Sequence, residues 1–227
     1  MYLVVLGLVI VAIIFGPGIW VQRVLTKYAE PADRYAGTGA QLARHLLNNN
    51  GLEAVKVEQT EEGDHYDPTE KAVRLTPDKF EGRSLTAITV AAHEVGHALQ
   101  DRDAYGPLRL RTHLVKATRH VEKLGAGILM VSPFIGALTR VPMLGAFMFL
   151  GGLLTLGSST VIHLVTLPTE FDASFNRALP ILLEQNLLKK SDRRRARRIL
   201  KAAAYTYVSA SLMSLLNIAR WWAILRR

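Results

Sequence analysis

The sequence predicts a mainly α-helical membrane protein with three to four transmembrane helices and a small α+β unit in the cytoplasm. Two observations lead to this fold class. Hydrophobic residues make up 49% of the 227 residues while aromatic residues make up only 7%, and the apolar residues gather in long uncharged runs, as they do in membrane proteins. Between the first run and the next lies a polar segment in which short helix and strand patterns alternate.

The first apolar run, residues 3–21, contains no charged residue. At ~1.5 Å per residue it is just long enough to cross the hydrocarbon core of a bilayer. No small-residue cleavage site follows it, so residues 1–22 are expected to form a retained transmembrane anchor and not a cleaved signal peptide. Arg23, Lys27 and Arg34 follow at once, and the positive-inside rule then places the chain from this point onward in the cytoplasm.

Residues 23–121 are expected to form the α+β unit. Three stretches have the apolar spacing of helices, and two have the alternation of strands. Residues 64–68 have the composition of a turn. The expected helices are residues 38–49, the stretch from a capping Ser84 to residues 101–103, and residues 109–123, and the expected strands are residues 53–59 and 72–76.

The remaining chain divides into three segments. Residues 122–167 are expected to form a transmembrane hairpin with a tight turn near Arg140; a buried hairpin of a soluble protein is the alternative, which the long uncharged run disfavours. Residues 168–201 form a polar segment that ends in a basic helix. Residues 202–227 form a last apolar helix that either spans the membrane or lies along its surface.

Charge and cysteine content exclude several classes of function. The chain has no cysteine, which excludes disulfides, thiolate zinc sites and cysteine catalysis. The formal net charge is +9, but residues 21–121 carry equal numbers of basic and acidic residues while residues 168–204 carry an excess of basic ones. This distribution disfavours a nucleic-acid-binding face and favours a basic segment that contacts the lipid bilayer.

The motif His93-Glu94-Val95-Gly96-His97 lies within one of the expected helices. Residues four apart share one helix face, so both imidazoles can bind one Zn²⁺. Glu94 is rotated by about 100° from His93 and can take a proton from zinc-bound water without binding the metal. The alternative is that two histidines simply face solvent on a surface helix.

A catalytic zinc needs a third protein ligand and one open position. Glu170 follows directly after an apolar stretch, and two membrane crossings between His97 and Glu170 would return the chain to the side of the motif. The alternative is a carboxylate that only stabilises a helix start.

Further candidates could orient a ligand or stabilise the transition state. His65 and Tyr66 precede the motif on an expected turn, His163 lies in an apolar helix, and Arg177 can pair with an acid near the site. Residues 72–76 either bind an extended substrate at a sheet edge or form an internal strand.

Three segments carry a resemblance to a known family: residues 64–68, 91–100 and 164–174. Through them the chain resembles the YugP-like family of membrane-bound neutral zinc metallopeptidases over nearly its full length. The resemblance implies a zincin-like unit of the gluzincin type, with His93 and His97 as zinc ligands, Glu94 as base and Glu170 as third ligand.

Related gluzincins have the pattern Glu-x-x-x-Asp at the third ligand. Here the fourth residue after Glu170 is Ser174, and the nearby acid is Asp172, which is a candidate to orient a ligand.

The function expected from these features is that of a zinc-dependent membrane endopeptidase. Metal-activated water would hydrolyse peptide bonds at the cytoplasmic membrane surface, and the substrates would be membrane-associated proteins or peptides. Two alternatives remain open: a zinc hydrolase of a non-peptide amide or ester, and a non-catalytic membrane scaffold stabilised by zinc.

Overall fold

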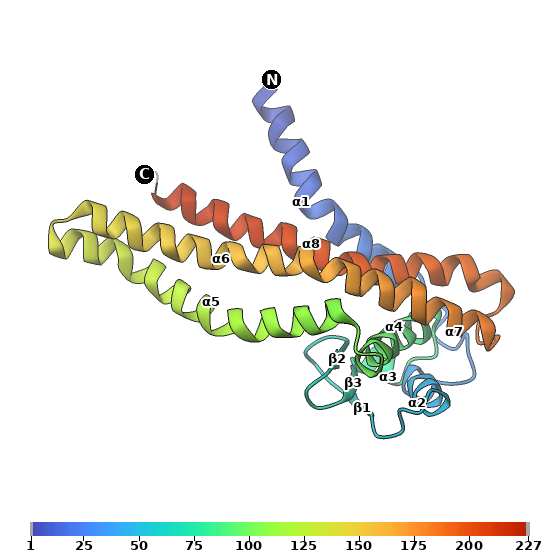
Figure 1. Cartoon of the computed structure of the whole chain (residues 1–227). Helices are drawn as coiled ribbons and strands as arrows, with labels where there is room; N and C mark the ends of the chain where they lie inside the picture. The colour runs from blue at the N-terminus through green and yellow to red at the C-terminus, as the bar shows by residue number, and fades with distance from the viewer. Residues whose placement is uncertain (1, 226–227) are drawn as a thin grey trace. The chain divides into compact units, whose positions relative to one another are not determined.

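The computed structural model describes residues 2–225, and for parts of the four longest helices it describes the backbone alone. The described chain is mainly helical with one small sheet (Figure 1). In chain order the elements are α1 (Tyr2–Lys27), α2 (Gly39–Asn49), β1 (Lys56–Gln59), β2 (His65–Asp67), β3 (Ala72–Leu75), α3 (Pro77–Phe80), α4 (Leu85–Arg102), α5 (Gly106–Thr139), α6 (Pro142–Phe171), the π-helix η1 (Asp172–Ala178), α7 (Leu179–Glu184), the 3-10 helix η2 (Lys190–Asp192) and α8 (Arg193–Leu225).

The chain divides into two compact units. The helical unit comprises Met1–Gly16, Leu110–Thr166 and Tyr207–Arg227, and the mixed unit comprises Pro17–Arg109 and Leu167–Thr206. The helices α1, α5, α6 and α8 each contribute residues to both units. The sheet, the motif helix α4 and Glu170 all belong to the mixed unit, which therefore holds the candidate site.

The expectation of three to four transmembrane helices is wrong. Within residues 2–225, as far as they are described, no helix combines the length and the apolar character that a membrane crossing requires. The expected spans in residues 1–22, 122–167 and 202–227, and with them the integral membrane location and the cytoplasmic orientation, are corrected by this finding. The apolar stretches continue into charged turns: α5 joins residues 109–123 to residues 124–138, and α8 begins with arginines.

The sheet has three short strands in the order β1-β3-β2. The central strand β3 pairs in parallel with β1 and antiparallel with β2, where Tyr66 stands opposite Val73. Two expectations change as a result. Residues 65–67 form a strand and not a turn, and residues 72–75 are internal, so they have no free edge for a substrate.

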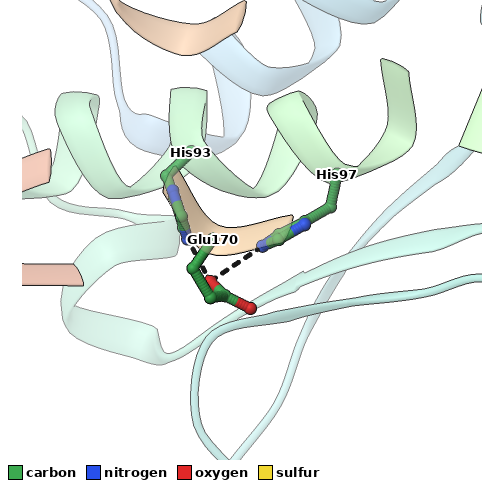
Figure 2. Close-up of side chains that lie close together, drawn as sticks. All are labelled: His93, His97 and Glu170. Atoms are coloured by element: carbon green, nitrogen blue, oxygen red, sulfur yellow. Dashed lines mark hydrogen bonds and ion pairs between the residues drawn. The ribbon is translucent and has the colours of Figure 1, made fainter. Parts of the chain in front are cut away.

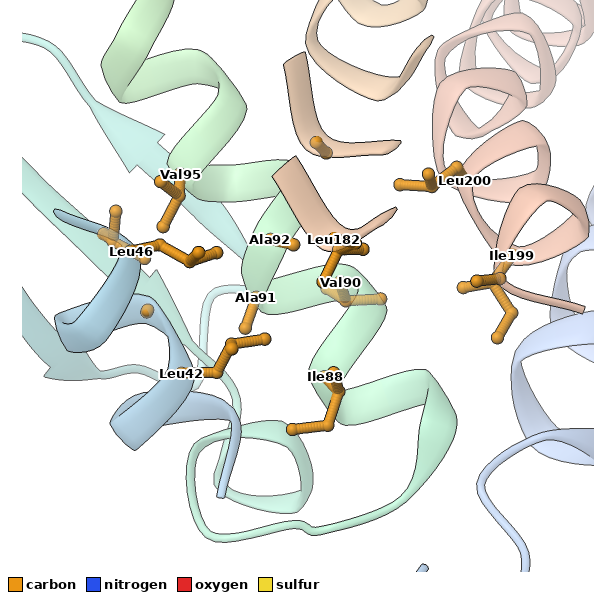
Figure 3. Packing of buried hydrophobic residues seen from close by; sticks show 14 of the residues in the cluster. Leu42, Leu46, Ile88, Val90, Ala91, Ala92, Val95, Leu182, Ile199 and Leu200 are labelled. Atoms are coloured by element: carbon orange, nitrogen blue, oxygen red, sulfur yellow. The ribbon is translucent and has the colours of Figure 1, made fainter. Parts of the chain in front are cut away.

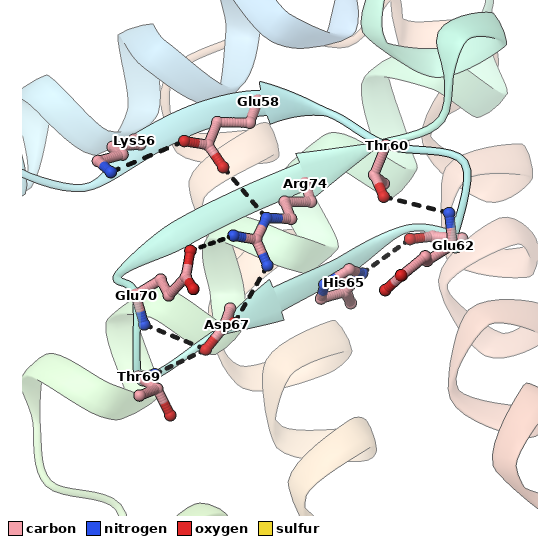
Figure 4. Close-up of polar contacts among 10 residues, drawn as sticks. Lys56, Glu58, Thr60, Glu62, His65, Asp67, Thr69, Glu70 and Arg74 are labelled. Carbon is pink, nitrogen blue, oxygen red and sulfur yellow. Dashed lines mark hydrogen bonds and ion pairs between the residues drawn. The ribbon is translucent and has the colours of Figure 1, made fainter.

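One arginine links all three strands of the sheet. The Arg74 guanidinium on β3 contacts Glu58 on β1 at 3.1 Å, Asp67 on β2 at 3.1 Å and Glu70 in the connecting turn at 2.5 Å (Figure 4). These partly exposed ion pairs help to fix the strand register, because a slip of one residue would move Arg74 to the other face.

Helix α4 is the central element of the mixed unit. Ser84 caps it, as expected, since its Oγ accepts a hydrogen bond from the Ala87 amide at 3.1 Å. Every residue from 85 to 100 is buried. Leu42 of α2 packs on one side of the helix, while Leu182 of α7 and Leu200 of α8 pack on the other (Figure 3). A helix that is buried all round holds its side chains in fixed positions, which suits a metal site.

The segment after α6 winds as the π-helix η1 and packs closely against α4. A Cβ added to Gly96 would lie 2.6 Å from the Ala173 carbonyl oxygen, so only glycine permits this approach. π-Helical turns are rare and occur often at functional sites. Here the π-helix begins at Asp172, two residues after Glu170.

Candidate metal centre

Three side chains converge at the contact between α4 and the end of α6 (Figure 2). His93 and His97 lie one turn apart on α4, and Glu170 lies in the last turn of α6. The Nε2 atoms of both histidines lie 3.2 Å from the same Glu170 oxygen, Oε2. The three candidate ligand atoms lie within 4.8 Å of one another, and all three residues are buried. The structure thus brings the three expected ligands together, and their role as zinc ligands stays a prediction.

The two nitrogen–oxygen spacings of this group fit one tetrahedral zinc ion. Two ligand atoms that are each ~2.0 Å from a zinc ion, at the tetrahedral angle, stand about 3.3 Å apart. The observed nitrogen–oxygen distances of 3.2 Å match this value. Two imidazoles and one carboxylate are also the ligand set of catalytic zinc sites that keep a fourth position open.

The charge of the site also favours a cation. Burial raises the pKa of Glu170, but the neighbouring imidazoles, when protonated, outweigh burial and hold the pKa well below its usual range. A bound metal ion would act in the same direction. An ionised carboxylate with 0% exposure requires an opposite charge beside it, and the protonated imidazoles or a metal ion can supply that charge.

Each histidine also forms a hydrogen bond through its second ring nitrogen, Nδ1. His97 Nδ1 lies 2.9 Å from Gln100 Oε1, and His93 Nδ1 lies 3.0 Å from Ser174 Oγ. Neither residue was among the sequence candidates. A signal was present, because Gln100 stands three residues after His97 on the same helix face and Ser174 stands four residues after Glu170.

Asp172 contacts neither histidine. Its carboxylate accepts hydrogen bonds from Gln100 Nε2 at 2.8 Å, Arg177 Nε at 2.8 Å and Asn176 Nδ2 at 2.9 Å. Burial raises the pKa of Asp172, but these donors prevail and lower it below its usual range. Arg177 also contacts Asp103 at the end of α4. Asp172 thus reaches His97 only through Gln100.

The remaining sequence candidates have other surroundings. The Tyr66 hydroxyl donates to Asp101 Oδ2 at 2.7 Å, and burial, followed by this bond, raises the pKa of Tyr66. His65 Nδ1 lies 2.8 Å from the Gly63 carbonyl oxygen. Glu94 is buried on α4 beside His93. The side chain of His163 lies outside the described residues.

Comparison with known proteins identifies the family. A family model described as "Putative neutral zinc metallopeptidase" matches residues 2–226. The chain belongs to this family. A relative from Bacillus subtilis (strain 168), named "Putative membrane protease YugP", is 35% identical over 197 residues, which are 86% of this chain and 84% of the relative. No solved structure matches the chain.

Family membership and site geometry agree on the cofactor. The family is one of zinc metallopeptidases, and the buried group of His93, His97 and Glu170 can hold the metal ion. The resemblance inferred from the sequence motifs is confirmed at the level of the family.

Proposed function

We propose that this protein is a zinc-dependent endopeptidase that hydrolyses peptide bonds in protein or peptide substrates. His93, His97 and Glu170 would hold the zinc ion, and Glu94 would act as the general base. The observation that carries the proposal is the convergence of three candidate ligand atoms within 4.8 Å, with both histidine Nε2 atoms 3.2 Å from the same Glu170 oxygen. The helix that supplies the two histidines also bears Glu94 next to His93. Membership of the zinc metallopeptidase family supports it.

The chemistry divides between the metal and the chain. When bound, zinc polarises the scissile carbonyl and lowers the pKa of a water molecule in the open position. Glu94 accepts the proton of that water and later transfers it to the leaving amine. Glu94 is turned by about 100° around the helix from His93, so it stands beside the metal position while the two imidazoles face it.

The decisive variant is Glu94→Gln, which keeps the size of the side chain and removes its basicity. We expect peptide cleavage to fall by about 10²–10⁴-fold, the usual contribution of a general base. Zinc content and melting temperature should stay unchanged, because Glu94 is not a ligand. Cleavage of an unfolded protein substrate, metal analysis and thermal unfolding measure the three quantities.

The matched control is Glu81→Gln, which alters an exposed glutamate between α3 and α4. This variant should cleave at the rate of the wild type. Equal cleavage by the wild type and by Glu94→Gln would sink the proposal. The same assay with amide and ester substrates that contain no peptide bond separates a peptidase from another zinc hydrolase, because the ligand set serves both.

A further inference from the structure

We infer that Gln100 and Ser174 are positioning residues that dictate which nitrogen of each histidine binds the metal. The inference rests on the proposed zinc site and goes beyond its ligands. Gln100 and Ser174 are both fully buried, and each contacts the Nδ1 atom of one histidine. The other hydrogen-bond partners of Gln100 and Ser174 determine whether each residue donates to its histidine or accepts from it. This determines in turn which imidazole nitrogen carries the proton.

The orientation of the Gln100 amide follows from its two other contacts. Its nitrogen, Nε2, lies 2.7 Å from the Thr169 carbonyl oxygen and 2.8 Å from Asp172 Oδ2. A carbonyl oxygen only accepts hydrogen bonds, so the amide nitrogen must face it. A flipped amide would place oxygen against oxygen. The Gln100 oxygen therefore faces His97 Nδ1, and because an amide oxygen cannot donate, His97 Nδ1 must carry a proton.

Ser174 likewise requires a proton on Nδ1 of His93. Its hydroxyl lies 3.2 Å from the Leu200 carbonyl oxygen of α8, which only accepts. The single hydroxyl proton is used in that bond. The Ser174 oxygen is then left to accept, and His93 Nδ1, 3.0 Å away, must be the donor.

Both rings are thus restricted to one mode of metal binding. With Nδ1 protonated, the nitrogen available to a metal is Nε2 in each ring, and both Nε2 atoms face Glu170 Oε2. The two positioning residues act through different elements. Gln100 lies on α4 and ties His97 to the backbone just before Glu170, while Ser174 lies on η1 and ties His93 to α8.

Ser174 accepts as a neutral oxygen because the Leu200 carbonyl takes its proton. A carboxylate at position 174 would face that carbonyl without a proton to share.

The test compares Gln100→Met and Ser174→Ala with a matched control. Partners of this kind typically contribute 10–100-fold to metal affinity, so each variant should weaken zinc binding by about that factor in competition with a chelator. The control is Thr89→Val, which removes a buried side-chain hydrogen bond to the Leu85 carbonyl on the same helix. It should bind zinc as the wild type does.

A second readout assigns each effect to one ring. In ¹⁵N-histidine spectra of the zinc-loaded protein, both imidazoles should show a protonated Nδ1 whose proton exchanges slowly with solvent. Ser174→Ala should accelerate exchange for His93 alone, and Gln100→Met for His97 alone. Since the wild-type spectrum already reports the bound nitrogen, coordination through Nδ1 in either ring would overturn the inference even if a variant did not fold.

The outcomes separate this inference from the proposed function. Zinc affinity within twofold of the wild type in both variants overturns the positioning role, whatever the activity. Tight zinc binding with the expected ring effects, but no peptide cleavage by the wild type, supports the positioning role and refutes the proposed peptidase.

Discussion

At the scale of single residues, we expect Tyr66 to take no part in catalysis because its hydroxyl already has a hydrogen-bond partner. Its hydroxyl donates to Asp101, which also pairs with Lys71. We therefore expect Tyr66→Phe to change the peptide cleavage rate by less than about threefold, while the free energy of unfolding falls by about 1 kcal/mol, the usual value of one hydrogen bond. Rate measurements and urea unfolding give both values. A hundredfold loss of rate at normal stability would instead assign Tyr66 to the transition state.

The ligand atoms could be predicted from sequence far better than their supports. The pair His93 and His97 follows from a local helix spacing, and any α-helix at that position would bring them together. Gln100 and Ser174 act through the approach of η1 and α8 to α4. No local pattern encodes that approach, so a buried glutamine and a serine could not be distinguished from ordinary helix residues.

At the scale of elements, the contact between α4 and η1 depends on Gly96. In Gly96→Ala the new Cβ would lie 2.6 Å from the Ala173 carbonyl oxygen, so the two helices must move apart. We expect the free energy of unfolding to fall by about 1–3 kcal/mol, as for other overpacked cores. Zinc affinity should fall as well, because α4 carries two ligands and η1 continues the segment that carries the third.

The control for this prediction is Gly106→Ala at the start of α5, where an added Cβ meets no atom within 4 Å. Chemical unfolding and chelator competition measure the two effects. If Gly96→Ala and Gly106→Ala had the same free energy of unfolding and the same zinc affinity, the close approach of α4 and η1 would not matter to the site.

Elements were predictable where a local signal marked their ends. Thr38 and Ser84 cap α2 and α4 as their side chains suggest. The strand β2 was not predictable, because residues 64–68 have turn composition and become a strand only by pairing with β3. The end of α5 was also not predictable from composition. The helix runs from Gly106 to Thr139 and continues where its residues change from cationic to apolar.

At the scale of the whole molecule, a partly buried ion pair joins distant parts of the chain within the mixed unit. Arg34 Nε lies 2.6 Å from Asp192 Oδ2, and Asp192 is fully buried. Burial raises the pKa of Asp192, but hydrogen bonds from Arg34 and Tyr35 prevail and lower it. A carboxyl with a lowered pKa stabilises the fold above its unfolded pKa, and this contribution disappears as the pH falls through the folded value.

Asp192→Asn should therefore lower the free energy of unfolding by about 2 kcal/mol at pH 7, the scale of hydrogen bonds to a charged group. The difference from the wild type should shrink on acidification below pH 4, because the wild type then loses the same charge. Urea unfolding of both proteins from pH 7 to below pH 4 measures this difference in the free energy of unfolding. The exposed Asp33→Asn serves as the control, and a gap that stayed constant with pH would contradict the ionic explanation.

The sequence was least informative about the global fold class. The long apolar runs predicted membrane spans. The hydropathy of a segment does not show where the helix that contains it begins and ends. No helix of the described residues has the length and the apolar character that a membrane crossing requires. The argument that two crossings return Glu170 to the motif thereby loses its premise. The structure nevertheless places Glu170 beside the histidines, because η1, which follows Glu170, packs against α4.

The mixed unit is assembled from two stretches, residues 17–109 and 167–206, and the metal ligands are divided between them. Two ligands come from the first stretch and one from the second. In a chain without cysteine, a zinc ion at this centre would be a cross-link between the two stretches, comparable in its topology to a disulfide. Metal occupancy would then report that the two stretches have docked, so that metal binding and the assembly of the mixed unit occur together.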